Sequence, residues 1–561
     1  MRKTGVFIAY LLVFSLFLEV SHASDTIPLS CMNKKTFLVH ISNVVKGCEK
    51  TEVSLGAGAI PHSLIRPTVL DKQLMYRFKA AQAAAAKDGQ KIYIVSGFRS
   101  LTRQKTLDVL ALTLLLLVIV VLVNVFLGTA IAAGLHYVKI PYPRILLVST
   151  ILPLAIPSYV FTYTWMAIFP ALEGVWAAAF ILCLSTMPYM ILAVSISFQR
   201  IDSGLIEVAR SLGLSKPAVF TRVILPQVRR SISAGALLSG LYVLSDFGAV
   251  SLLNVETLTV SIQNLFKSSY DRGAASVIGI LLFLAATIFV LFESILKGRD
   301  FESRGAEGFQ ERIRRISNPG LSVFTILVIA IYGFLAVVIP FYVLISRYLQ
   351  NPSVVACSDL FSAALSTVSV AGLGAFIAFI LSLPLALLAT QGPSAVAAIS
   401  GKVILISHAL PGVVVGLALV SFGSRLGPLY QSIFLLAFAY AVLFLAKSVA
   451  STSAALTLVS PQLKEVAATL GKSKSSIAMQ VVFPIALPNL ALGVLLVFLT
   501  AMKELPATLM LRPTGMDTLA TEIWSFAAIS RFNEAAPYAL LLVIIAAIPT
   551  FILTIPRAAK S

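Results

Sequence analysis

Long apolar runs separated by short polar segments fill the chain from about residue 107 to near its end. A helix needs ~20 apolar residues to cross a bilayer, and these runs are of about that length. Backbone N–H and C=O groups find no partners in lipid, so such spans must be helical. The pattern predicts spans near 107–133, 145–169, 174–198, 226–250, 275–296, 321–346, 360–389, 403–423, 432–452, 484–506 and 537–556. We therefore expect an all-α polytopic membrane protein.

One polar segment occurs twice. Glu207–Gly213 (EVARSLG) returns as Glu465–Gly471 (EVAATLG), 258 residues later (465 minus 207). The same offset relates Pro226 to Pro484, each at the start of an apolar run. Self-similarity over so long a period predicts two homologous halves joined in one polypeptide. The predicted boundaries are 106–298 for the first half, 299–320 for a basic linker and 321–557 for the second half.

Charge places these segments relative to the membrane. Charged residues make up 12% of the chain, whereas soluble proteins carry roughly 25%. The formal net charge is +19, and Lys and Arg collect in the repeated loops and in the linker. This distribution is typical of cytoplasmic loops and calls for no nucleic-acid partner. We expect these loops to face the cytoplasm, residues 24–105 to lie outside it, and the halves to hold 5–6 and 6 spans.

The repeated loop has the features of a docking element. Glu207–Leu212 can form a short amphipathic helix, which Gly213 can end in the left-handed conformation. Proline is tolerated in the first turn of the helix that follows. The spacing Glu-x-Ala-x-x-x-Gly, followed by proline, resembles the coupling loop of ABC-importer permeases. That resemblance implies that two docking sites for a cytosolic ATPase are marked by Glu207, Ala209, Gly213 and Pro226 and by Glu465, Ala467, Gly471 and Pro484.

Two further stretches narrow the resemblance. Met502–Arg512 (MKELPATLMLR) and Leu152–Tyr159 (LPLAIPSY) are similar to the fused permease of bacterial ferric-iron ABC importers, over about residues 106–556. The fused thiamine permease is the near alternative, but that family lacks the Lys-Glu-Leu-Pro-Ala-Thr stretch. The resemblance implies a multi-pass protein of the bacterial inner membrane, surrounded by lipid. It also implies two copies of an ABC ATPase and an extracytoplasmic substrate-binding protein as partners.

Two acidic residues are candidates for the translocation pathway. Asp246 and Glu504 are again 258 residues apart, and each stands at the end of a predicted span. Acidic residues close to a span are often functional, and a hard cation such as ferric iron prefers carboxylate oxygens. The alternative is structural, because either residue could cap the end of a helix.

The N-terminal region has a different character. Residues 1–23 have the layout of a signal peptide or a retained signal anchor. Residues 24–105 form a predicted small extracytoplasmic α/β fragment, in which Cys31 and Cys48 are candidates for a disulfide. Residues 60–104 resemble a truncated zinc D,D-carboxypeptidase through Ser96–Ser100 and Gln104. Because the histidine and carboxylate ligands of that family are missing, we expect the fragment to be inactive and predict no metal site.

The chain lacks an energy source. Gly471-Lys472-Ser473 mimics the end of a phosphate-binding loop, but Val466 stands where its first glycine is needed. We expect no cofactor on this chain and ATP on a partner subunit, so the chain is a transport permease rather than an enzyme. The alternatives are an importer of the same type for thiamine or an oxyanion, a membrane-anchored D,D-carboxypeptidase remnant, and a channel or secondary transporter working without ATP.

Overall fold

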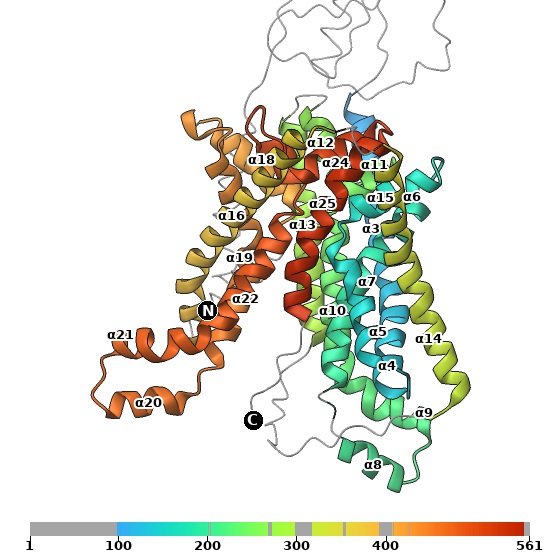
Figure 1. The fold of residues 1–561 in the computed structure, drawn as a ribbon, viewed down its shortest axis with the longest axis vertical. Coiled ribbons are helices and arrows are strands. Elements are labelled where there is room, and N and C mark those ends of the chain that lie inside the picture. Colours follow the sequence, from blue (N-terminus) through green and yellow to red (C-terminus); the bar gives the residue numbers. More distant parts are fainter. Residues whose placement is uncertain are drawn as a thin grey trace, which may run out of the picture. The chain divides into compact units, whose positions relative to one another are not determined.

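The computed structural model describes residues 98–199, 201, 203–267, 272–297, 317–351, 355–391, 407, 409–425 and 427–554. These residues form helices and connecting turns, with no β-strand among them (Figure 1). The expectation of an all-α membrane protein is thereby confirmed for this part. The predicted signal segment, residues 24–97 of the predicted α/β fragment with Cys31 and Cys48, and most of the linker lie outside it.

The chain divides into two compact units, one of residues 1–111 with 261–278 and one of residues 112–260 with 279–561. The candidate site lies wholly in the second unit. The helices before the linker are α3 (Phe98–Val123), α4 (Thr129–Tyr137), α5 (Pro143–Ile151), α6 (Ser158–Ile168), α7 (Val175–Phe198), α8 (Ser203–Ser211), α9 (Lys216–Val219), α10 (Leu225–Ser245), α11 (Gly248–Leu252), α12 (Leu258–Lys267) and α13 (Arg272–Lys297).

The helices after the linker repeat much of this order. They are α14 (Pro319–Gly333), α15 (Ile339–Gln350), α16 (Cys357–Gln391), α18 (Gly412–Gly423), α19 (Ile433–Thr457), α20 (Pro461–Thr469), α21 (Lys474–Ile477), α22 (Phe483–Ala501), α23 (Pro506–Leu511), α24 (Leu519–Ala528) and α25 (Phe532–Thr554).

The 258-residue period of the sequence is also a period of the backbone. α7 and α19 begin 258 residues apart, as do α10 and α22 and also α11 and α23. Even an irregularity is repeated: the π-helical segment Phe220–Ile224 has its counterpart in Ala478–Val482. In both halves this segment joins the short helix after the repeated loop to the long helix that follows. The two halves are therefore two copies of one structural unit.

Eight helical segments of the described chain are long and apolar enough to cross a membrane. They are Thr106–Tyr137, Val175–Phe198, Arg272–Glu293, Pro319–Gln350, Cys357–Thr390, Ile433–Thr457, Ser475–Ala501 and Phe532–Thr550. They match the predicted spans at 107–133, 174–198, 275–296, 321–346, 360–389, 432–452, 484–506 and 537–556.

Three predicted spans differ in the structure. The run at 145–169 is not one straight helix, since α5 with its 3-10 extension and α6 meet at 92°. Pro157 causes the break, because the residue before a proline is driven out of the helical region and Ile156 is extended (φ −91°, ψ 119°). The run at 403–423 yields only the shorter helix α18 among the described residues. The run at 226–250 is divided into α10 and α11, and α10 carries Arg229 and Arg230.

The second half has one span more than the described first half. α14 and α15, joined through the π-helical segment Phe334–Val338, form this span. It packs against α4, α5 and α6 of the other half. Arg347 donates a hydrogen bond to the Ala167 carbonyl (2.7 Å), and the Tyr332 hydroxyl donates one to the Leu184 carbonyl (3.1 Å). The extra span thus ties the two halves together.

Candidate functional site

The repeated loops fold into two short helices, α8 and α20, which we call the loop helices. Both lie in the lower part of Figure 1, whereas α11 and α24 lie in the upper part. A side-chain cap begins α20: Ser460 accepts a hydrogen bond from the Leu463 N–H (3.4 Å), and Pro461 occupies the first turn. Two loops that the sequence places 258 residues apart therefore lie at one end of the same unit.

The two loop helices end in the same way. Gly213 (φ +81°) and Gly471 (φ +76°) both adopt the left-handed conformation. Around Gly213, the Leu214 N–H donates to the Ala209 carbonyl (3.2 Å) and the Gly213 N–H donates to the Arg210 carbonyl (3.0 Å). The bonds around Gly471 connect the equivalent residues, at 3.2 and 3.0 Å. This is the Schellman motif, formed twice, and glycine adopts its positive φ without the strain that a side chain brings.

The predicted docking residues divide into inward and outward positions. Ala209 and Ala467 are buried, and Ala209 packs in a cluster with Phe198 and Val219. Glu207 and Glu465 are exposed. Pro226 and Pro484 are each the second residue of a long helix, α10 and α22, as predicted for a proline in the first turn. The alanines thus hold the loop helices to the unit, while the glutamates point away from it.

Each loop helix carries an apolar stripe, in keeping with the amphipathic helix expected at Glu207–Leu212, but sequence reasoning did not show that the stripe is exposed. Leu205, Val208 and Leu212 are 50%, 56% and 76% exposed, and their counterparts Leu463, Val466 and Leu470 are 47%, 56% and 76% exposed. Spacings of three and four residues bring each set onto one helix face. That spacing was legible in the sequence, but without the fold it could equally have been an inward face. Each loop helix offers an apolar contact stripe with its glutamate nearby.

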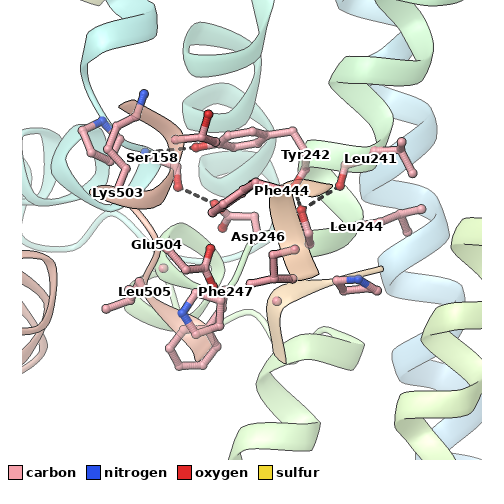
Figure 2. Close-up of a pocket in the computed structure, with 18 of the residues that line it drawn as sticks. Ser158, Leu241, Tyr242, Leu244, Asp246, Phe247, Phe444, Lys503, Glu504 and Leu505 are labelled. Atoms are coloured by element: carbon pink, nitrogen blue, oxygen red, sulfur yellow. Dashed lines mark hydrogen bonds between the residues drawn. The ribbon is translucent and has the colours of Figure 1, made fainter. Parts of the chain in front are cut away.

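A cavity of about 210 Å³ lies between the two halves (Figure 2). The first half contributes Ser158, Tyr159 and Asp246 to its lining, and the second half contributes Glu504 with Lys447 and Lys503. The structure therefore brings the two acidic candidates to one cavity. Both lysines were missed as site residues, although a lysine inside an apolar run is an unusual and informative feature.

Asp246 stands at the junction between α10 and α11, and it is 8% exposed. Its Oδ1 accepts hydrogen bonds from the N–H groups of Ala249 (3.0 Å) and Val250 (3.4 Å), and its Oδ2 accepts one from the Ser158 hydroxyl. Its backbone carbonyl accepts a further bond from Thr259 (2.7 Å). The carboxylate thus caps α11 and is held by α6, which is the structural alternative the sequence left open.

Glu504 occupies the equivalent junction between α22 and α23. Its Oε1 accepts a hydrogen bond from the Ala507 N–H (3.1 Å), so it also caps the helix that follows. Among the described residues no hydroxyl group hydrogen-bonds to it as Ser158 does to Asp246. The reason is that α18 begins with Gly412 where α6 begins with Ser158, each directly after a proline. A Cβ atom at Gly412 would lie 2.5 Å from Glu504 Oε1, so any other residue there would displace the Glu504 carboxylate from its present position.

The two lysines have different surroundings. Lys503 donates a hydrogen bond to the Leu154 carbonyl (2.9 Å), at the break between α5 and α6. Lys447 lies over the Phe444 ring, with Nζ 5.4 Å from its centroid, and interacts electrostatically with Glu504. In the described part of the chain the Lys447 ammonium group forms no hydrogen bond. Tyr189 and Ser245 stand at the equivalent positions of the first half, so this pair of positive charges belongs to the second half alone.

Comparisons with known proteins decide the family. The family model described as "Binding-protein-dependent transport system inner membrane component" matches residues 124–299 and, a second time, residues 378–558. This chain belongs to that family. The permease is thus built from two copies of one domain, as the repeat predicted.

Individual relatives are transport permeases as well. The permease is 31% identical over 459 residues to the Fe(3+)-transport system permease protein FbpB 2 of Haemophilus influenzae, which covers 81% of this chain and 90% of that protein. It is also 31% identical over 115 residues to the spermidine/putrescine transport system permease protein PotB of Escherichia coli, 19% of this chain and 41% of that protein. Over 131 residues, 22% of this chain and 32% of the relative, it is 28% identical to the chloroplastic sulfate permease 2 of Chlamydomonas reinhardtii.

These matches set the general function. The protein is an ABC-type permease, a multi-pass inner-membrane transport subunit and not an enzyme. The resemblance of residues 60–104 to a zinc D,D-carboxypeptidase has no support in these comparisons. In the structure, Phe98, Arg99 and Ser100 are already the first turn of α3, which continues into a span.

Proposed function

We propose that this permease imports ferric iron in an ATP-driven importer. The observation that carries the proposal is its 31% identity to an Fe(3+)-transport permease over 90% of that protein's length. The stretch Met502–Arg512, which contains Glu504, forms part of the cavity lining, so the segment that carries the ferric-permease resemblance is also the segment beside the cavity. Carboxylate oxygens are suitable ligands for a hard trivalent cation.

In this proposal, energy enters through the two loop helices. An ATPase dimer on the cytoplasmic side docks one subunit against α8 and the other against α20, with the apolar stripes in its grooves. ATP binds to the ATPase and no cofactor binds to this chain. A substrate-binding protein delivers the iron from the extracytoplasmic side. ATP favours one arrangement of the permease only because the ATPase binds ATP more tightly in that arrangement.

The alternating access that this requires has a plausible physical basis in the fold. Each loop helix is joined through a π-helical segment to a long helix, α10 or α22. α10 ends directly before Asp246, and α22 ends at Ala501, three residues before Glu504. A rigid-body displacement of a loop helix is therefore transmitted along one helix to the cavity wall.

The test is ATP-dependent uptake of radiolabelled ferric ion in cells that carry the permease with its ATPase and binding protein. Wild type is compared with the double variant Gly213→Val, Gly471→Val, in which a β-branched residue must adopt positive φ at both helix ends. Gly174→Val is the matched control, since Gly174 also has positive φ (+87°) and open space around it but lies outside the loop helices.

We expect uptake by wild type and by Gly174→Val, and loss of uptake by the double variant with the protein still in the membrane. Wild type that reaches the membrane, assembles with its partners and takes up no ferric ion would overturn the proposed function. Uptake by the double variant equal to that of wild type would refute the role of the loop helices.

A further inference from the structure

We infer that the cavity contains a one-sided ferric-ion site, built from the carboxylate of Glu504 and the hydroxyl of Tyr159, while Asp246 serves only as structure. The inference rests on the proposed function, because it names the residues that would hold that cargo within the permease. Asp246 and Glu504, which occupy equivalent positions in the sequence repeat, thereby have different roles.

The carboxylates of Asp246 and Glu504 differ in how many of their oxygens accept hydrogen bonds. The described residues occupy both oxygens of Asp246: one accepts two backbone N–H groups and the other accepts the Ser158 hydroxyl. Glu504 uses only Oε1, for the Ala507 N–H, and its other oxygen has no partner in the described part of the chain. A ligand that recruits Asp246 has to break its bond to Ser158 or compete with the cap of α11. A ligand that approaches Glu504 meets an oxygen with its acceptor capacity intact.

Tyr159, a second residue with an unpartnered polar atom among the described residues, belongs to the lining of the same cavity. Tyr159 is 3% exposed, and its hydroxyl has no hydrogen-bond partner among the described residues. It lies within electrostatic reach of Glu504. Burying a hydroxyl without a partner costs on the order of 1–3 kcal/mol, so a ligand that supplies the partner recovers that cost.

The two oxygens suit a hard cation. The described residues contain no group of three His, Cys, Asp or Glu side chains placed to hold a metal ion, so the inferred site is one of few ligands that binds its cargo transiently. A carboxylate and a phenol offer oxygen alone, which hard, highly charged cations prefer. Binding at Tyr159 replaces the O–H bond by an oxygen–iron bond, and the released proton leaves to bulk water.

The neighbouring lysines keep the site weak, as a transport site must be. Lys447 interacts electrostatically with Glu504, so its ammonium group partly offsets the charge of the carboxylate when no cargo is present. An incoming ferric ion competes with that ammonium group and is repelled by it and by Lys503. Binding is then strong enough to admit the cation and weak enough to release it, a balance that conduction through a membrane also requires.

Purified full-length permease in lipid nanodiscs provides the test, with ferric ion supplied as its nitrilotriacetate complex. Two quantities are measured: the amount of radiolabelled iron bound, and the visible charge-transfer absorption that an iron–phenolate bond produces. Glu504→Gln keeps an oxygen for the Ala507 N–H, so it preserves the cap of α23. Tyr159→Phe removes only the hydroxyl. Asp246→Asn is the matched control on the other half.

We expect Glu504→Gln to lower the affinity for ferric ion by at least ~10-fold and Tyr159→Phe to abolish the visible absorption. Lys447→Met should raise the affinity, because it removes a competing positive charge. Asp246→Asn should leave the affinity within about 2-fold of wild type and lower only the melting temperature, as expected of a residue that caps a helix.

Affinity and absorption unchanged in both Glu504→Gln and Tyr159→Phe would overturn the site, while ferric uptake by the assembled importer would leave the proposed function standing. An Asp246→Asn variant that loses affinity as much as Glu504→Gln would overturn the one-sided assignment. Absence of ferric uptake by the assembled wild-type importer would instead overturn the proposed function itself.

Discussion

The two halves are alike at their loop helices: each loop helix ends on a glycine with positive φ and exposes three apolar side chains at equivalent positions. At the cavity, in contrast, the two halves differ in nearly every polar residue. The first half places Asp246 against Ser158, and the second places Glu504 against Gly412. Under the proposed function, the loop helices face the same kind of partner, and both halves present the same surface to it. At the cavity, where the two halves would share one cargo, one half can provide the ligands and the other the structural support.

The largest expected effect comes from the apolar stripes, which are the same in both halves. Leu212→Asp and Leu470→Asp should each weaken binding of the ATPase by about 2 kcal/mol or more, since each loses the burial of one leucine and places a carboxylate in an apolar groove. Binding of the purified ATPase to permease in nanodiscs measures this. The exposed Leu429 provides a control through Leu429→Asp, which should change nothing. A large effect of one variant and none of the other would show that the symmetry of the stripes is not functional.

Exchanging the acidic residue and its neighbour between the halves tests most directly whether the two sides of the cavity have different roles. The double variant Gly412→Ser, Glu504→Asp gives the second half the pair found in the first, with the shorter acid making room for the serine. We expect ferric uptake to fall by at least ~10-fold, because the carboxylate is then held by a hydroxyl group and no longer free for cargo.

The reciprocal variant Ser158→Gly, Asp246→Glu serves as its control, and uptake by well-inserted protein is the measurement. Equal losses in both double variants would mean that the two halves contribute equally to the pathway. Retained uptake after the exchange in the second half would show that Glu504 needs no unoccupied oxygen.

Ser158→Ala tests the structural role of Asp246. Removal of the hydroxyl leaves a buried carboxylate oxygen without its donor and should destabilise the protein by about 1–3 kcal/mol. Thermal unfolding in detergent measures the change. Ser149→Ala is the matched control, because the Ser149 hydroxyl only donates to the Leu146 carbonyl of its own helix (2.8 Å). Equal melting temperatures for the two variants would contradict the assignment of Asp246 as a support for the fold.

The smallest effect is expected at the helix ends. Gly213→Ala and Gly471→Ala should each destabilise the end of a loop helix by about 1 kcal/mol, and by the same amount in both halves, because both residues hold positive φ and neither would bring a Cβ into contact. Hydrogen exchange of the α8 and α20 amides measures it. Gly333→Ala, in open space but in ordinary helical conformation, should instead be neutral or slightly stabilising. Faster exchange at only one loop helix would reveal a difference that the backbone does not suggest.

The repeat made much of this architecture predictable. The positions of α8 and α20, their glycine ends and the prolines at 226 and 484 all followed from one recurring motif, because helix ends and first turns depend on local sequence. The break at Pro157 was missed even though its signal was local. A continuous apolar run was given more weight than the restriction that proline places on the residue before it.

The cavity was only partly predictable. Asp246 and Glu504 could be named from their equivalent positions, but their inequality depends on Ser158 and Gly412, which lie on a separate helix of each half. Ser158 and Gly412 are hard to recognise as equivalent in the sequence. The prolines before them, Pro157 and Pro411, are 254 residues apart, whereas the loop motif repeats after 258 residues. The missing partner of the Tyr159 hydroxyl is a property of tertiary packing and leaves no trace in sequence order.

Joining α8 and α20 in one polypeptide also fixes how a partner is captured. The two loop helices are always present in equal number, and a dimeric ATPase that engages one of them meets the other as an intramolecular site. For such linked sites the effective concentration is on the order of millimolar, so the avidity of the pair can exceed either single affinity by ~100-fold or more. Damage to one loop helix is therefore hidden in a cell rich in ATPase and is exposed when the ATPase is scarce.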